Sequence, residues 1–224
     1  MPWAVRLGIE KLVKTKLKKA ACTGSLISPE FVLTAAHCFN VITDGEKFYL
    51  TFNSNSSEIA PNSKGFRITL KRQSNSNVFV HHKFDQNNMV GRFDLALIKL
   101  EKPICGPMFP ICIHCGSVEK FRRGSAIIAG WGRTHPKGNL SKELMGRFAQ
   151  LTDCEGAQNK SIKICIEYNT TQQGDSGGAL LASNGSNFVQ IGVLSGRPRN
   201  TMRKAYSQLD GPWIQRITGT KCAN

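Results

Sequence analysis

Three short stretches of the sequence carry side chains that could together perform acyl transfer. Ser176 lies in the run Gly-Asp-Ser-Gly-Gly (174–178), and a serine hydroxyl is a poor nucleophile unless a base takes its proton. His37, in the run Thr-Ala-Ala-His-Cys (34–38), is a candidate for that base. Asp94 stands immediately before an apolar run, where its carboxylate could orient the histidine. The three residue types therefore indicate a nucleophilic serine site.

Each residue also has a simpler interpretation. The run around Ser176 could be an ordinary polar turn, His37 a structural histidine or, beside Cys38, a metal ligand, and Asp94 a residue that begins a strand. The combination favours the chemical interpretation. His37 would act as general base and then as general acid, and Asp94 would fix its tautomer. Gly174 lets the backbone turn tightly, so that the N–H groups of Gly174 and Ser176 could form an oxyanion hole.

The rest of the chain must position these side chains. It has 224 residues, 40% of them hydrophobic, and its apolar segments are short and separated by turn residues. This pattern favours an all-β barrel or sandwich. Prolines, glycines and cysteines cluster at 101–121, which predicts a linker between two halves. A proline near the start of 210–217 and a glycine just after it predict a short C-terminal helix.

The chain carries a formal net charge of +15. Its Lys and Arg residues concentrate at 11–19, 64–72, 120–123 and 197–204. Any one cluster is best interpreted as a solvated surface, but the four together suggest binding to a polyanion such as a glycosaminoglycan. No zinc-finger or RNA-binding signature appears, so we expect no specific nucleic-acid partner. No apolar run is long enough to span a membrane.

The sequence resembles the chymotrypsin-like serine proteases from Pro2 to about Ile217. The resemblance is carried by the runs around His37, Asp94 and Ser176, in the chain order of that family, and by Pro-Trp at 2–3 and Gly-Trp-Gly at 130–132. It implies two six-stranded antiparallel β-barrels with the site between them and a short C-terminal helix. We expect the division to fall at 1–105 and 106–224. The implied activity is that of a serine endopeptidase.

The resemblance also implies two disulfides, Cys22–Cys38 and Cys154–Cys165. The pairing of the remaining cysteines is left open by the sequence: Cys105, Cys112, Cys115 and Cys222. The run Cys-Ile-His-Cys at 112–115 has metal-site spacing, but no second pair completes four ligands. We therefore expect neither a metal nor another cofactor.

Several residues match positions that line the substrate pocket in this family. They are Thr170, Gln173, Ser195, Gly196 and Lys204. A threonine at 170, where an aspartate would select Lys or Arg, argues against trypsin-like cleavage. A lysine at 204 would instead favour acidic P1 residues through a charge-assisted hydrogen bond, unless it is merely an exposed lysine in a basic loop. The resemblance also implies that Ser195 bonds the aspartate of the triad, here Asp94, and that its backbone pairs with substrate as an added strand.

One expected feature of the family is missing from this sequence. Family members are activated by a cleavage that frees an apolar N-terminus, usually Ile-Val-Gly-Gly, whose ammonium pairs with the aspartate before the nucleophile, here Asp175. No such segment occurs, and the Pro-Trp run begins directly after Met1, which indicates a truncated start. A buried Asp175 without a counter-charge would be costly. We therefore expect residues 1–224 to be inactive or zymogen-like and the full-length product to be a protease; a catalytically inactive, cationic binding protein is the alternative.

The cysteine content suits an oxidising compartment. The number of cysteines is even, at 8, and we expect a protein that is secreted or stored in secretory granules. Protein or peptide substrates and a protease inhibitor are the expected partners. Sequons for N-glycosylation occur at Asn55, Asn139, Asn159, Asn169 and Asn184.

Overall fold

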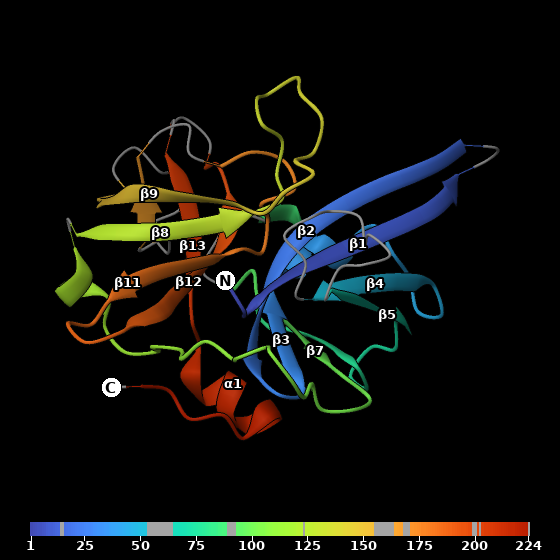
Figure 1. The fold of residues 1–224 in the computed structure, drawn as a ribbon, viewed down its shortest axis with the longest axis horizontal. Coiled ribbons are helices and arrows are strands. Elements are labelled where there is room, and N and C mark those ends of the chain that lie inside the picture. The colour runs from blue at the N-terminus through green and yellow to red at the C-terminus, as the bar shows by residue number, and fades with distance from the viewer. Residues whose placement is uncertain are drawn as a thin grey trace.

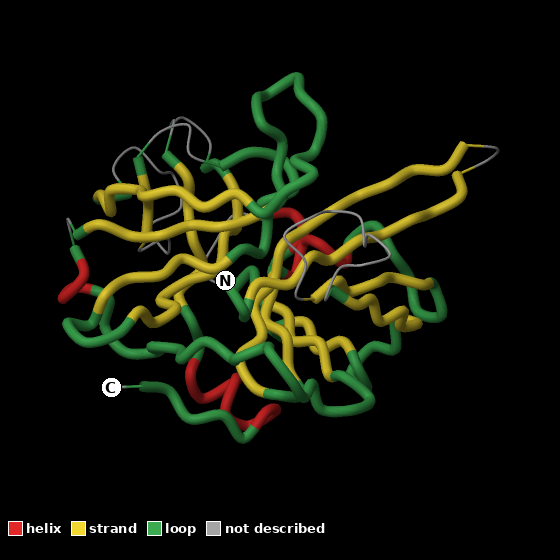
Figure 2. The backbone as a smooth tube through the Cα atoms, viewed as in Figure 1, coloured by secondary structure: helices red, strands yellow, loops and turns green. Residues whose placement is uncertain are grey.

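The computed structural model describes most of the chain as β-structure. The described residues are 1–13, 16–52, 65–88, 93–122, 124–154, 164–167, 171–198, 201 and 203–223. Figure 1 shows them as two groups of strands that lie side by side, with a short helix below, and Figure 2 shows how few helical residues there are. None of the helices in the described ranges is long and apolar enough to cross a membrane.

The first half of the chain forms a seven-stranded antiparallel sheet. Its order is β5-β4-β1-β2-β3-β7-β6 over the described residues. The strands are β1 (Ala4–Val13), β2 (Lys16–Ser28), β3 (Phe31–Thr34), β4 (Lys47–Phe52), β5 (Phe66–Lys71), β6 (Val78–Val80) and β7 (Ala96–Lys99), with the 3-10 helices η1 (Ala36–Phe39) and η2 (Gln86–Asn88). On β1, the alternate residues Val5, Leu7 and Ile9 are buried in one core, as the two-residue period of a strand requires.

The second half closes into a six-stranded antiparallel barrel. Its order is β10-β13-β12-β11-β8-β9. The strands are β8 (Ser125–Gly130), β9 (Met145–Thr152), β10 (Ile164–Ile166), β11 (Ala179–Ser183), β12 (Phe188–Gly196) and β13 (Lys204–Gln208), preceded by the 3-10 helix η3 (Glu119–Phe121). Alternate residues of each strand fill the barrel, among them Ile128, Leu151 and Tyr206.

The C-terminal helix α1 (Gly211–Thr218) belongs to the core of the first half. Trp213 and Ile214 are buried in the same cluster as the first-half sheet. The Asp210 side chain caps the helix by accepting from the Trp213 N–H at 3.2 Å, and Gly219 ends it in the left-handed conformation. The helix end is held further by His81, which is buried and bonds the Asp210 carboxylate through Nε2 at 3.1 Å.

A disulfide not predicted from the sequence fixes the tail that follows α1. Cys115, in the connecting segment between the halves, is bonded to Cys222 across 107 residues. Gly211, at the start of α1, lies against this bond: a Cβ added there would meet the Cys115 Cβ at 2.8 Å. The connecting segment and the C-terminal tail are therefore joined at the base of the helix.

The predicted all-β, chymotrypsin-type fold with a short C-terminal helix is confirmed. The second barrel is closed with six strands, but the described first half is a seven-stranded sheet rather than a six-stranded barrel. Within this sheet β1 and β2 pair over ten positions, from Ala4–Ser25 to Val13–Lys16, and extend as a hairpin beyond the other strands (Figure 1). The division at 1–105 and 106–224 stays a prediction.

Candidate active site

Strand pairing in the first half brings His37 and Asp94 together. β3 pairs with β7 so that Thr34 lies opposite Ala96; His37 follows β3 in η1, and Asp94 directly precedes β7. The His37 Nδ1 lies 2.6 Å from the Asp94 Oδ2, and the His37 backbone N–H donates to Oδ1 at 2.9 Å. The Asp94 side chain is 1% exposed and that of His37 19%. The carboxylate thus holds His37 through two separate bonds, one to its ring and one to its backbone.

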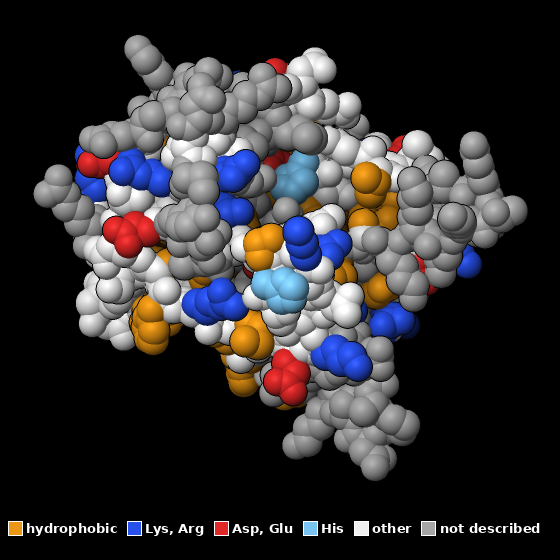
Figure 3. All heavy atoms as spheres, turned by 90° about the horizontal axis from the view of Figure 1, so that it is seen from above, with side chains coloured by type: hydrophobic (Ala, Val, Ile, Leu, Met, Phe, Trp, Pro, Cys, Tyr) orange, Lys and Arg blue, Asp and Glu red, His pale blue; other side chains and the backbone are white. Residues whose placement is uncertain are grey.

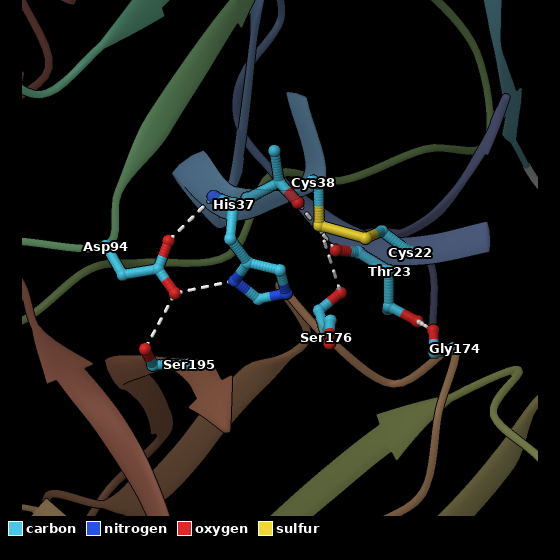
Figure 4. Close-up of a disulfide and its surroundings, with 9 residues drawn as sticks. Cys22, Thr23, His37, Cys38, Asp94, Gly174, Ser176 and Ser195 are labelled. Carbon is cyan, nitrogen blue, oxygen red and sulfur yellow. Dashed lines mark hydrogen bonds and ion pairs between the residues drawn. A yellow bond between two sulfur atoms is a disulfide. The ribbon is translucent and has the colours of Figure 1, made fainter. Parts of the chain in front are cut away.

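A residue of the second half completes the surroundings of Asp94. Ser195, in β12, donates its hydroxyl to Asp94 Oδ2 at 2.6 Å. The buried carboxylate therefore accepts three hydrogen bonds, which satisfy a polar group that water cannot reach. Figure 4 shows His37 and Ser195 approaching Asp94 from opposite halves of the molecule.

Ser176 lies on the far side of the imidazole from Asp94 (Figure 4). Within the described part of the chain, no hydrogen bond joins the His37 ring to the Ser176 hydroxyl. Such bonds are often long or misaligned without substrate and tighten when it binds. The arrangement has the order that proton transfer needs, with the carboxylate, the ring and the hydroxyl in sequence.

The loop around Ser176 leaves two backbone donors open. Gly174 and Gly177 have positive φ angles of 104° and 81°, which glycine adopts without strain. The Gly177 N–H donates to the Leu194 carbonyl at 2.9 Å and so ties the loop to β12. The N–H groups of Gly174 and Ser176, by contrast, donate to no group among the described residues. These are the two N–H groups that the sequence assigns to an oxyanion hole.

Thr23 is a site residue that the sequence analysis missed. It is fully buried in β2, where its N–H donates to the Ser176 carbonyl at 2.7 Å and its hydroxyl donates to the Gly174 carbonyl at 3.1 Å. A strand of the first half thus holds the loop of the second half by two bonds. The only signal in the sequence is that Thr23 directly follows Cys22, whose predicted partner adjoins His37.

The cysteines near the site are disulfide-bonded. Cys22 and Cys38 are joined, with their Cα atoms 6.4 Å apart, and Cys154 is joined to Cys165. The sulfur atoms of the first pair lie close to the His37 ring, but a disulfide offers no thiolate to a metal. The metal alternative at 112–115 is wrong, because Cys115 is bonded to Cys222.

Asp175 is a partly buried carboxylate held by backbone amides. Its Oδ1 accepts from the Gly132 N–H at 2.7 Å and its Oδ2 from the Gln172 N–H at 2.9 Å. Burial raises the pKa of Asp175, while these two bonds, and more weakly Arg147 and Lys204, act in the opposite direction. The fit is close: a Cβ on Gly132 would lie 2.3 Å from the carboxylate carbon, so the position requires glycine.

A shallow pocket that is open to solvent adjoins this carboxylate. It lies at one end of the second barrel, and its lining includes Ile128, Gly132, Met145, Arg147, Asp175 and Tyr206. Its lining also includes Arg133, so the pocket combines apolar side chains with two arginines and one carboxylate.

The predicted substrate-pocket residues differ in how exposed they are and in what they contact. Thr170 lies outside the described residues. Gln173 is exposed, and its Oε1 accepts from Arg133 Nε at 2.9 Å. Gly196 lies at a bulge in β12, and Lys204 is partly buried rather than an exposed surface lysine. Burial, and then the charge of Arg197, lower the pKa of Lys204.

The two groups of strands, with the His–Asp pair in one and the serine loop in the other, have the architecture of the chymotrypsin-type proteins. The comparison with protein families agrees: the family model described as Trypsin matches residues 1–210. The chain therefore belongs to the trypsin family.

Proposed function

We propose that the protein is a serine endopeptidase that works through an acyl-enzyme. Ser176 Oγ attacks the substrate carbonyl carbon while His37 Nε2 takes the hydroxyl proton, and the tetrahedral oxyanion accepts from the N–H groups of Gly174 and Ser176. His37 then gives its proton to the leaving amine, and water repeats the sequence to release the acid. Asp94 holds the imidazole and stabilises its charged form.

The observation that supports this proposal best is the bonding of Asp94. Three donors converge on one buried carboxylate: two come from His37 and the third from Ser195 in the other half. A purely structural aspartate could be satisfied by neighbouring backbone amides. Here the carboxylate instead holds a partly exposed imidazole that faces the loop around Ser176. That loop also carries the two N–H groups, of Gly174 and Ser176, that have no acceptor among the described residues.

We further propose that acidic residues are preferred at P1. Lys204 is partly buried in β13, and its nearby charges are Arg197, which also favours an acidic ligand, and Asp175, which opposes it. A cation in a confined site gains a charge-assisted hydrogen bond from a carboxylate. The matching experiment is a peptide library that varies P1. A preference for basic or large apolar residues would exclude this specificity.

The proposed reaction is tested with a fluorophosphonate probe, because it reports an activated serine without knowledge of the substrate. The probe should label the activated full-length product at Ser176 and should not label the same product carrying Ser176→Ala, which serves as the matched control. Labelling should also fall strongly in His37→Ala. Equal labelling of the wild type and Ser176→Ala, or none in either, would show that the serine is not activated.

A second candidate is a catalytically inactive, cationic binding protein. The charge of +15 favours it, and Figure 3 shows Lys and Arg side chains spread over one face of the molecule. Such a protein would bind a glycosaminoglycan, with an affinity that falls steeply as salt is raised. Retention on a heparin column together with no probe labelling would favour this candidate over the protease.

Secretion and glycosylation fit either candidate. Three disulfides form within the described residues, and such bonds persist in oxidising compartments. Of the predicted sequons, Asn139 and Asn184 are exposed, whereas Asn55, Asn159 and Asn169 lie outside the described residues. We propose glycans at the two exposed sites, which a mass shift on deglycosylation would test.

A further inference from the structure

The segment between β8 and β9 lies against the loop that carries Ser176. Arg133 and Leu140 of this segment form an antiparallel bridge, and Figure 1 shows the chain between them rising as a loop above the strands. The Arg133 backbone N–H donates to the Gln173 carbonyl at 2.9 Å. The segment also packs on Gly174, since a Cβ added there would lie 2.6 Å from the Leu140 Cδ2. Arg133 is therefore held directly beside the residue that precedes Gly174.

The guanidinium of Arg133 is partly buried and is oriented by two hydrogen bonds. Its Nε donates to the Gln173 Oε1 at 2.9 Å, and its Nη1 donates to the Gly138 carbonyl. Because the guanidinium is planar and rigid, these bonds also fix Nη2, which donates to no group among the described residues. Arg133 lines the pocket beside Asp175, but it is not one of the charges that shift the pKa of that carboxyl. Its Nη2 is thus available to an acceptor from outside the chain.

The same contact orients the exposed side chain of Gln173. Its Oε1 is occupied by the arginine, so the amide nitrogen Nε2, which carries two donors, is the end left open. Within the described part of the chain, Nε2 has no acceptor. The Arg133–Gln173 pair therefore offers donors from a guanidinium and from an amide at one place. A carboxylate has two oxygens that accept from such donors, and the charge of the arginine favours it over a neutral acceptor.

The position of the Arg133–Gln173 pair indicates which part of a substrate it would meet. Figure 4 shows Ser195 and Gly174 on opposite sides of Ser176. The family resemblance puts the P1 residue, which precedes the cleaved bond, on the side of Ser195. The part of the substrate that follows the cleaved bond would then leave past Gly174, which is the side of the Arg133–Gln173 pair.

We propose that Arg133 and Gln173 form a subsite for an acidic substrate residue that follows the cleaved bond. The carboxylate would accept from Nη2 of the guanidinium and from Nε2 of the amide. The surrounding segment does not oppose an anion, because its charged residues from 133 to 142 are all basic: Arg133, Lys137 and Lys142. Arg133 determines specificity in this scheme, and the inference rests on the proposed protease function.

Pairs of peptide substrates that differ in a single residue after the cleaved bond test this subsite. Glu and Gln are compared at P1′, P2′ and P3′ in turn, with the residues before the bond unchanged and the activated full-length product as the enzyme. At one of these positions kcat/KM should be about three- to tenfold higher for Glu, as expected of a charge-assisted contact that is partly exposed to water. The preference should shrink as the salt concentration is raised.

Variants at the pair should change this ratio of kcat/KM for Glu to that for Gln. Arg133→Gln should bring the ratio close to unity because it removes the charge. Gln173→Glu should do the same, since its own carboxylate would occupy the guanidinium. Lys142→Gln, which removes an exposed cation of the same segment, is the matched control and should keep the ratio within about twofold of the wild type. The ratio is taken within each variant, so a general loss of activity through a disturbed loop cancels.

Fluorophosphonate labelling separates failure of this inference from failure of the protease proposal. The probe has no peptide after the reacting atom and does not reach the subsite. A wild-type product that is labelled, yet cleaves the Glu and Gln peptides equally well at all three positions, would overturn the inference and leave the protease proposal intact. An unchanged ratio in Arg133→Gln would overturn it too. If the activated product is neither labelled nor able to cleave any peptide, the protease proposal and the subsite are both wrong.

Discussion

Removing the hydroxyl of Thr23 tests how strongly the first half of the molecule positions the loop that carries Ser176 in the second half. Thr23→Val keeps the shape of the side chain and the backbone bond to Ser176, but removes the donor to the Gly174 carbonyl. Because Thr23 is fully buried, water cannot replace that donor. The carbonyl of an oxyanion-hole residue would then be left without its partner.

The size of the effect follows from this loss. A buried acceptor that loses its only side-chain donor costs about 1–3 kcal/mol. Because the Gly174 carbonyl belongs to the loop around Ser176, much of this free-energy cost destabilises the conformation of that loop rather than the whole fold. A penalty of about 1.4 kcal/mol lowers the population of the correct loop tenfold, so we expect labelling at Ser176 to slow by about 5- to 100-fold.

Labelling rates and thermal unfolding should be measured together on Thr23→Val and on two controls. Thr23→Ser keeps the donor and should label nearly as fast as the wild type. Thr51→Val removes a buried hydroxyl that has no hydrogen-bond partner among the described residues, and should therefore change labelling by less than about twofold. If Thr23→Val labels as fast as Thr51→Val, the hydroxyl does not position the loop and the reasoning fails.

Three further changes test the fold around the site. Burial lowers the pKa of His81 in the folded protein below its ordinary value of 6.5, so the unfolded chain binds more protons as the pH falls through that value. The folded protein therefore loses stability in acid, and His81→Gln should flatten the fall in the urea midpoint between about pH 7.5 and 5.5. An unchanged slope would show that the loss of stability does not come from His81. Cys222→Ser, which opens a 107-residue loop, should lower the free energy of unfolding by about 2–4 kcal/mol in urea titrations, and no loss would show that the bond to Cys115 contributes little. Gly177→Ala should prevent stable folding, since its Cβ would lie 2.1 Å from the Thr34 hydroxyl; a protein that melts like the wild type would refute this packing.

The family and its fold could be predicted because their signals are local runs of residues. The sequence around His37 and Ser176 needs no knowledge of strand register to be interpreted, and the short C-terminal helix is marked by its own proline and glycine. The bond from Ser195 to Asp94 follows the expectation taken from the resemblance. The catalytic roles of these residues remain predictions until a reactive serine is measured.

What the sequence could not supply depends on register and on long-range contacts. The Cys115–Cys222 bond joins residues 107 positions apart, and four unassigned cysteines allowed several pairings. Thr23 is not marked by its residue type, because only the docking of the loop against β2 gives its hydroxyl a partner.

The burial of Trp213 and Ile214 in the first-half core has a consequence for how the protein is made. A ribosome releases the first-half strands long before it releases the helix that covers them. Until translation is almost complete, the nascent sheet exposes the apolar surface to which the two side chains bind. A chain interrupted shortly before residue 213 would carry every residue of the His37 site and the serine loop, yet would be a substrate for chaperones rather than a finished protein.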